Sequence, residues 1–241
     1  MNNISFDDII DLIKKELILN DIEPTEEIFD KFEKYYNYLI EYNNNVNLTA
    51  ITDKNEVYIK HFLDCIKYSK IYKQNASLCD IGTGAGFPGV VLKIIRPDLI
   101  ITLVDSLNKR VVFLNNLISK LGLDDITTLH YRAEDIEFKN KYLNSFNYVV
   151  ARAVAEMPTL TEYCLPFVKN GGNFIAYKGN NGQNEAILAK KCIKLLGGTV
   201  ENIYNYNILD NERTLVVINK VHITDIKYPR GQNKPRLSPI K

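Results

Sequence analysis

The chain of 241 residues has no tryptophan, two methionines, three histidines and four cysteines. Cys65, Cys79, Cys164 and Cys192 lie far apart and form no C-x-x-C pair, which argues against a zinc site or a disulfide framework. No segment is long and apolar enough to cross a bilayer, and the first residues lack the basic and apolar regions of a signal peptide. We therefore expect a cytoplasmic protein without a metal, and a monomer is the simplest assumption.

Charge is nearly balanced over the whole chain, with a formal net charge of +1, but it is unevenly distributed. Residues 1–60 hold six basic and thirteen acidic residues, whereas the remainder holds 24 basic and 16 acidic residues. The second region is therefore able to bind a polyanion despite the neutral total. The alternative is that these charges are simply solvated.

Residues 1–72 have the pattern of a helical extension. Ser5 followed by Asp8 is typical of a helix N-cap with an acidic first turn, and an apolar stripe follows it. A second helix is expected to start near Thr25, and a third to run over residues 53–71.

Residues 73–226 alternate between short apolar strands and helices. Strands are expected at 77–81, 100–104, 126–130, 146–151 and 173–177, with a closing antiparallel pair at 199–206 and 214–220. Helices are expected at 86–95, 107–121, 156–168 and 184–196. This alternation of strands and helices predicts an α/β domain with a mainly parallel, seven-stranded sheet covered by helices on both faces. The basic, proline-containing tail, residues 227–241, is expected to be an extended surface segment.

The glycine-rich segment between residues 80 and 89 follows the first strand and opens a helix. Gly84-x-Gly86-x-x-Gly89 formally matches a dinucleotide-binding fingerprint, but alone this is weak evidence. Asp80, two residues before Gly82, would repel a pyrophosphate, whereas it suits the cationic amino group of S-adenosylmethionine. The sequence therefore favours S-adenosylmethionine, while a dinucleotide or a purely structural loop remains an alternative.

Two further acidic positions suit a nucleoside. Asp105 ends the second strand, where its carboxylate can bind a ribose diol, although both candidate cofactors contain one. Glu134, after the third strand, can contact an adenine edge together with neighbouring backbone groups. These positions indicate a nucleoside-containing cofactor without deciding which.

The ordered set of motifs resembles the RsmG family, also called glucose-inhibited division protein B. The matching segments, in order, are Asn47-Leu48-Thr49, His61-Phe62-Leu63-Asp64, Asp80 to Gly89, Val104-Asp105-Ser106, Lys109-Arg110, Ala133-Glu134-Asp135, Ala151-Arg152-Ala153, Tyr177-Lys178-Gly179, Arg230 and Lys234-Pro235. They span nearly the whole chain. Each piece alone is unspecific, but the set is specific. Phe87 departs from the leucine that many relatives carry there.

The resemblance implies a class I S-adenosylmethionine-dependent methyltransferase (Rossmann-like) fold and methylation of guanine N7 in 16S ribosomal RNA. By resemblance, the cofactor contacts fall on Gly82, Phe87, Ala133, Glu134 and Arg152, to which the ribose argument adds Asp105. Basic residues expected to contact RNA are Lys178, Arg110, Arg230 and Lys234. No catalytic residue is assigned, because guanine N7 carries a lone pair and no proton, so its methylation needs no general base. A non-catalytic RNA-binding or ribosome-assembly factor, or a methyltransferase for a non-RNA substrate, remains an alternative.

Overall fold

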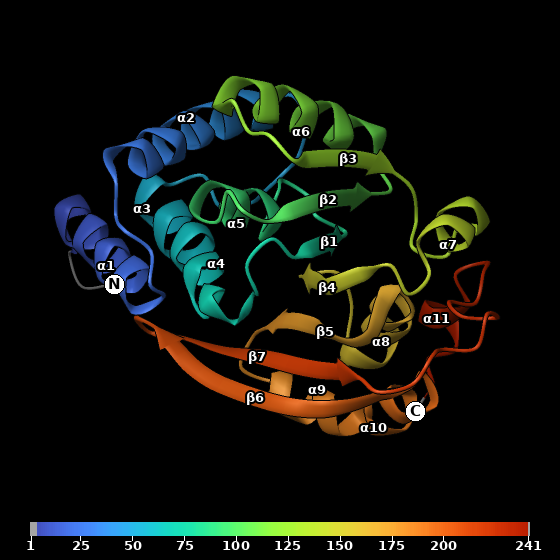
Figure 1. Cartoon of the computed structure of the whole chain (residues 1–241). Helices are drawn as coiled ribbons and strands as arrows, with labels where there is room; N and C mark the ends of the chain where they lie inside the picture. Colours follow the sequence, from blue (N-terminus) through green and yellow to red (C-terminus); the bar gives the residue numbers. More distant parts are fainter. Residues whose placement is uncertain (1–3, 241) are drawn as a thin grey trace.

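The computed structural model describes residues 4–240 and is built around one seven-stranded sheet (Figure 1). The strand order is β3-β2-β1-β4-β5-β7-β6, in which the first five strands are parallel and β7 runs antiparallel to both of its neighbours. The strands are β1 (Ser77–Ile81), β2 (Ile100–Asp105), β3 (Ile126–His130), β4 (Phe146–Arg152), β5 (Val168–Lys178), β6 (Gly198–Ile208) and β7 (Asn211–Lys220). The predicted seven-stranded, mainly parallel sheet is confirmed.

Helices cover both faces of this sheet. In chain order they are α1 (Phe6–Leu19), α2 (Glu26–Asn43), α3 (Lys54–Val57), the π-helical segment η1 (Tyr58–Leu63), α4 (Asp64–Ile66), η2 (Ser69–Ile71), α5 (Gly89–Ile95), α6 (Asn108–Leu121), α7 (Ile136–Tyr142), α8 (Met157–Cys164), η3 (Leu165–Phe167), α9 (Gly182–Leu188), α10 (Lys190–Leu195) and α11 (Lys234–Leu237).

The alternation of strand side chains divides the core into two layers. Leu103, Val150 and Ile175 point to one face and belong to the cluster that includes α1, α2, η1, α5 and α6. Val149 and Phe174, one residue away on β4 and β5, point to the other face and pack with residues of α7 to α10. In Figure 1 the two groups of helices lie on opposite sides of the central strands.

The N-terminal helices are part of the first layer rather than a separate body. Phe32 of α2 is fully buried and stacks on Phe62 of η1, with ring centroids 4.7 Å apart. The predicted N-cap is confirmed, because Ser5 and Asp8 form a capping box at the start of α1. The helical extension is therefore folded onto the sheet by shared apolar contacts.

The predicted third helix, residues 53–71, is wrong after Ile66. Helical backbone ends at Ile66, and Tyr68 has a left-handed φ of 60° before the short turn η2 begins. Its ring stacks on Tyr204 of β6 with centroids 4.6 Å apart. Tertiary packing thus overrides the local helical pattern here.

The sequence missed one helix, and two other expectations need correction. Helix α7 was not predicted. The single helix expected at 184–196 is divided into α9 and α10 at Ala189. The tail is not simply extended. It contains α11, it buries Tyr228 and Pro235, and Arg230 pairs with the buried Glu162. Proline and basic residues alone do not reveal such pairing.

Replacing Phe32 by alanine tests whether the N-terminal helices and the sheet share one core. We expect a loss of about 3–5 kcal/mol in the free energy of unfolding, because a large buried ring is removed. Phe32→Leu should lose less, since it keeps most of the apolar volume. Urea unfolding should show one transition for all three proteins. A separate early transition that leaves the main one unchanged would contradict a shared core.

Candidate functional site

Two cavities open at the carboxyl edge of the parallel strands, where β1 lies between β2 and β4. The first, which we call the ribose cavity, has a volume of about 290 Å³ and is lined by residues after β1, β2, β3 and β4, together with residues of α8 and the tail. The second, which we call the His61 cavity, has a volume of about 220 Å³ and lies between the glycine loop, the end of β4 and the N-terminal extension. This is the crevice where open α/β sheets bind ligands.

Gly82 belongs to the walls of both cavities. Its φ is +72°, and a Cβ placed there would lie 2.6 Å from Cγ2 of Val154. Only glycine suits this position, because the backbone is left-handed and the neighbouring side chain is close. The loop therefore lets a ligand run from one cavity into the other across bare backbone.

Asp105 is almost fully buried and binds the backbone of the glycine loop and of the segment that follows β2. Its Oδ1 accepts the amide of Leu107 at 2.9 Å, and its Oδ2 accepts the amide of Gly84 at 2.9 Å. Arg110 lies 3.3 Å from Oδ2 and also lines the His61 cavity, while its own Nε is buried without a hydrogen bond among residues 4–240. Arg110, predicted to contact RNA, thus lies inside the crevice.

Asp80 lies beneath the glycine loop and does not form part of either cavity wall. Its Oδ2 accepts the hydroxyl of Thr83 and the amide of Gly89, each at 2.8 Å. Its Oδ1 is buried with no hydrogen-bond partner within the described chain. Burial raises the pKa of this carboxyl to about 7. A buried carboxylate oxygen without a hydrogen-bond donor is suited to a cationic ligand group bound on the loop above it.

Arg152, at the end of β4, joins the sheet to the N-terminal extension. Its guanidinium donates to the carbonyl of Lys60 at 2.7 Å, to Nδ1 of His61 at 2.8 Å and to Sγ of Cys65 at 3.3 Å. Its Nε lies 3.5 Å from Oδ2 of the buried Asp64. The segment from η1 to α4 is therefore anchored to the sheet at four points by one side chain.

These contacts fix the state of His61. Nδ1 also lies 3.2 Å from the carbonyl oxygen of Lys60, but its contact with Arg152 is shorter. A guanidinium can only donate, so Nδ1 of His61 accepts and the proton resides on Nε2. Nε2 lies 3.2 Å from Oγ1 of Thr49 and donates to it. Burial, followed by the nearby Arg152 charge, lowers the pKa of His61 to about 3. His61 is thus neutral, and neither ring nitrogen is free to accept a proton.

Phe87 lies under the same cavity, between His61 and Tyr35. Its ring stacks on His61 with centroids 4.4 Å apart and on Tyr35 with centroids 5.3 Å apart. The hydroxyl of Tyr35 donates to the carbonyl of Ala85 in the glycine loop. Helix α2 therefore supports the loop directly, a role that its aromatic pattern did not reveal.

The remaining predicted residues divide into two groups. Ala133 and Glu134 line the ribose cavity, as does Asp105. Lys178 pairs with Glu185 at 2.7 Å, and Arg230 forms a two-point ion pair with Glu162. Of the four residues predicted to contact RNA, only Lys234 lies outside the ion pairs described for residues 4–240.

Sequence reasoning assigned no role to several residues that line the cavities. Leu48 and Thr49 belong to a motif that was noted only as a family signature, and they line the His61 cavity. Tyr163 and Asn233 line the ribose cavity and bond to each other, as their hydroxyl and amide oxygen are 3.2 Å apart. The motif at 47–49 was the one available signal.

Within the part of the chain that the structure describes, no group of three potential metal-ligating side chains occurs. Across the same residues, no helix has the length and apolar character needed to span a membrane.

Several solved structures share this architecture at low sequence identity. Ribosomal protein L11 methylase from Lactobacillus delbrueckii subsp. bulgaricus is 14% identical with a TM-score of 0.51, covering 68% of this chain and 79% of that one. M. jannaschii TYW2 in complex with AdoMet is 13% identical with a TM-score of 0.51, covering 64% and 73%. With its strand order and the crevice beside β1, the chain has the fold of the class I S-adenosylmethionine-dependent methyltransferases.

Sequence comparison narrows the class to one family. The family model described as GidB, rRNA small subunit methyltransferase G, matches residues 28–216. Ribosomal RNA small subunit methyltransferase G of Lactobacillus acidophilus is 46% identical, covering 93% of this chain and 96% of its own. The protein of that name in Desulforamulus reducens is 50% identical, covering 87% and 89%. This chain belongs to the rRNA small subunit methyltransferase G family, which confirms the resemblance found in its motifs.

The state of His61 is measurable by ¹⁵N NMR of the imidazole ring. We expect a neutral Nε2–H tautomer that does not change between pH 8 and pH 5, because the folded pKa is about 3. The unfolded chain takes up this proton near pH 6.5, so the folded state loses stability as the pH falls from about 6.5 toward 3. A His61 ring that titrates near pH 6.5, or carries its proton on Nδ1, would contradict the Arg152 contact.

Proposed function

We propose that this chain transfers the methyl group of S-adenosylmethionine to N7 of a guanosine in 16S ribosomal RNA. The observation that carries the proposal is the pair of cavities that meet at Gly82 in a member of an rRNA methyltransferase family. We assign the nucleoside to the ribose cavity of about 290 Å³, and the methyl-bearing end and the target base to the His61 cavity of about 220 Å³. The protein works in the cytoplasm as a monomer.

The residues that line these cavities support an assignment of the side chains that would hold the cofactor. Asp105 would accept from the ribose hydroxyls, and Ala133 and Glu134, which line the same cavity, would flank the adenine edge. The backbone of Gly82 passes between the two halves, and Phe87 and Arg152 bound the far half. S-adenosylmethionine supplies an electrophilic methyl group on a sulfonium cation. The negative potential of Asp80 below the loop favours this positive charge.

The chain contributes positioning rather than proton transfer. N7 of neutral guanine attacks through a lone pair and releases no proton, so no general base is required. The His61 ring is neutral and both of its nitrogens are hydrogen-bonded, so it is not available as a general base, which agrees with this chemistry. In-line displacement depends on how well the base is held against the methyl group.

Thr49 is suited to orient the guanine. Its Oγ1 already accepts the amide of Ile51 at 3.1 Å and the Nε2–H of His61. The hydroxyl proton is therefore left to donate elsewhere, and Thr49 lines the His61 cavity. The O6 atom beside N7 is an acceptor on the edge that must face the methyl group. We assign this hydroxyl to O6.

RNA outside the cavities is held by the basic residues of the tail. Lys234 and Arg236 belong to α11, and Arg236 lines the ribose cavity. Lys178 and Arg230 keep the strand end and the tail in place through their ion pairs and reach RNA only if these pairs open. Affinity should fall with rising salt, because phosphate contacts release counterions.

Labelled S-adenosylmethionine and small ribosomal subunits from cells that lack this protein test the activity. Label should enter one guanosine of the RNA, and mass analysis of the digested RNA should identify that nucleoside as 7-methylguanosine. Label in a metabolite or protein instead would indicate a non-RNA methyltransferase. Cofactor binding without any transfer, or no cofactor binding at all, would indicate an assembly factor.

Asp80→Asn tests the electrostatic role of the buried carboxyl. The substituted amide keeps an oxygen for Thr83 and Gly89, so the loop should remain folded. In the unchanged protein, a cofactor cation lowers the raised pKa of Asp80 and releases up to about one proton near pH 6. Cofactor affinity should then rise between pH 5 and 7, and should not do so in the variant. Calorimetry in buffers of different ionisation enthalpy counts these protons, and equal counts for the two proteins would refute the role.

Thr49→Val tests the proposed contact with O6. Valine has nearly the same shape but lacks the hydroxyl, and we expect methyl transfer to fall by roughly 10- to 100-fold, with cofactor affinity unchanged. Thr49→Ser is the matched control and should retain most activity. A valine variant as active as the serine variant would show that this hydroxyl does not position the base.

A further inference from the structure

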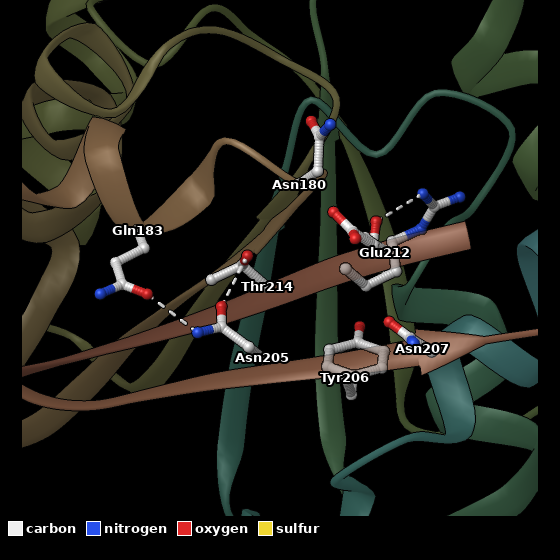
Figure 2. A pocket seen from close by; sticks show the side chains of 8 residues that line it. Asn180, Gln183, Asn205, Tyr206, Asn207, Glu212 and Thr214 are labelled. Atoms are coloured by element: carbon white, nitrogen blue, oxygen red, sulfur yellow. Dashed lines mark hydrogen bonds between the residues drawn. The ribbon is translucent and has the colours of Figure 1, made fainter. Parts of the chain in front are cut away.

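A third cavity lies between the β6–β7 hairpin and the start of α9 (Figure 2). It shares no lining residue with the other two cavities. We call it the hairpin cavity, and its volume is about 570 Å³. It is lined by Asn180, Gln183, Asn205, Tyr206, Asn207, Glu212, Arg213 and Thr214. Four of these eight residues carry a side-chain amide, and none is aliphatic. Such a lining suits a polar ligand with hydrogen-bonding edges and does not suit an apolar one.

The hydrogen bonds inside the hairpin cavity fix which amide groups remain available. Thr214 donates to Oδ1 of Asn205 at 3.1 Å, and Nδ2 of Asn205 donates to Oε1 of Gln183 at 2.9 Å. The two N–H groups of Gln183 therefore face away from this chain of bonds. In Figure 2 the amides of Asn180 and Asn207 make no hydrogen bond to the other residues drawn. The walls thus offer adjacent donors and acceptors.

Arg213 and Tyr206 add a cation and an aromatic ring. The hydroxyl of Tyr206 donates to Oδ1 of Asp64 at 3.0 Å, and Nε of Arg213 lies 3.7 Å from the same oxygen. Arg213 keeps about a quarter of its side chain exposed. An unpaired nucleotide offers what these groups recognise, namely a base edge, a π-face and a phosphate.

Asp64 connects the hairpin cavity with the His61 cavity. Its Oδ1 faces Tyr206 and Arg213, whereas its Oδ2 faces Arg152, which lines the His61 cavity. This buried carboxylate and its ion pairs therefore lie between the two cavities. The hairpin cavity is therefore linked through one side chain to the cavity assigned to the target guanine.

We propose that the hairpin cavity binds the unpaired nucleotide adjacent to the target guanosine and reads its base through Asn180, Gln183 and Asn207. The proposal rests on the proposed RNA methylation and adds a second recognition subsite to it. Because single-stranded bases are recognised on their hydrogen-bonding edges, this subsite gives the enzyme a preference for the flanking base. It also favours a target lying in an unpaired loop.

The double variant Asn180→Ala, Asn207→Ala tests this subsite. Both side chains are exposed, so folding and cofactor affinity should be unchanged. With small ribosomal subunits as substrate, KM should rise roughly tenfold, because two hydrogen bonds to a base are lost. Asn202→Ala is the matched control, since Asn202 is exposed on β6 but lies outside this cavity, and its KM should stay as in the unchanged protein.

Subunits that carry each of the four bases on either side of the mapped guanosine give the decisive measurement. The unchanged protein should prefer one base at one flanking position, and the double variant should lose this preference. The same preference in both proteins, or an unchanged KM in the double variant, would overturn the subsite while leaving methyl transfer intact. If the unchanged protein methylates no RNA, the proposed function fails first and the subsite fails with it.

Discussion

The site depends on the contacts of one largely buried guanidinium. Arg152 ends a central strand, yet its partners are Lys60, His61, Asp64 and Cys65 of the N-terminal extension. Arginine serves this purpose because its planar group donates in several fixed directions and keeps its charge when buried. Breaking a buried pair of this kind by removing one partner costs about 3–5 kcal/mol. We call these four contacts of Arg152 the clamp. The clamp determines the position of His61, the tautomer of its ring and the orientation of Thr49.

The clamp also explains why the helical extension and the sheet function as one unit. One wall of the His61 cavity comes from the glycine loop, the end of β4 and Arg110, and the other comes from Leu48, Thr49 and His61. Neither part of the chain forms the cavity without the other. The π-helical turn η1 lies at this junction, as such turns frequently do at functional sites.

Much of the fold was predictable, because strand alternation and glycine positions are local signals. The seven strands, the loop at Gly82 and the carboxylate at Asp105 were found in this way. The clamp was not, since it joins residues about ninety positions apart. Lys178 and Arg230 resemble free cations in the sequence, and only the fold reveals Glu185 and Glu162 beside them. Tyr68 ends a helix that the local pattern continues, because its ring packs on a distant strand.

The hydrogen bond from Tyr35 to Ala85 has a dynamic consequence. It ties the middle of α2 to the loop on which a ligand would rest, and the Tyr35 ring also stacks on Phe87. A ligand that binds only the folded loop shifts the local opening equilibrium of everything attached to it. Amide hydrogens of α2 should then exchange more slowly when the crevice is filled, although this helix lines neither cavity. Hydrogen exchange in α2 would thus report whether a ligand occupies the crevice.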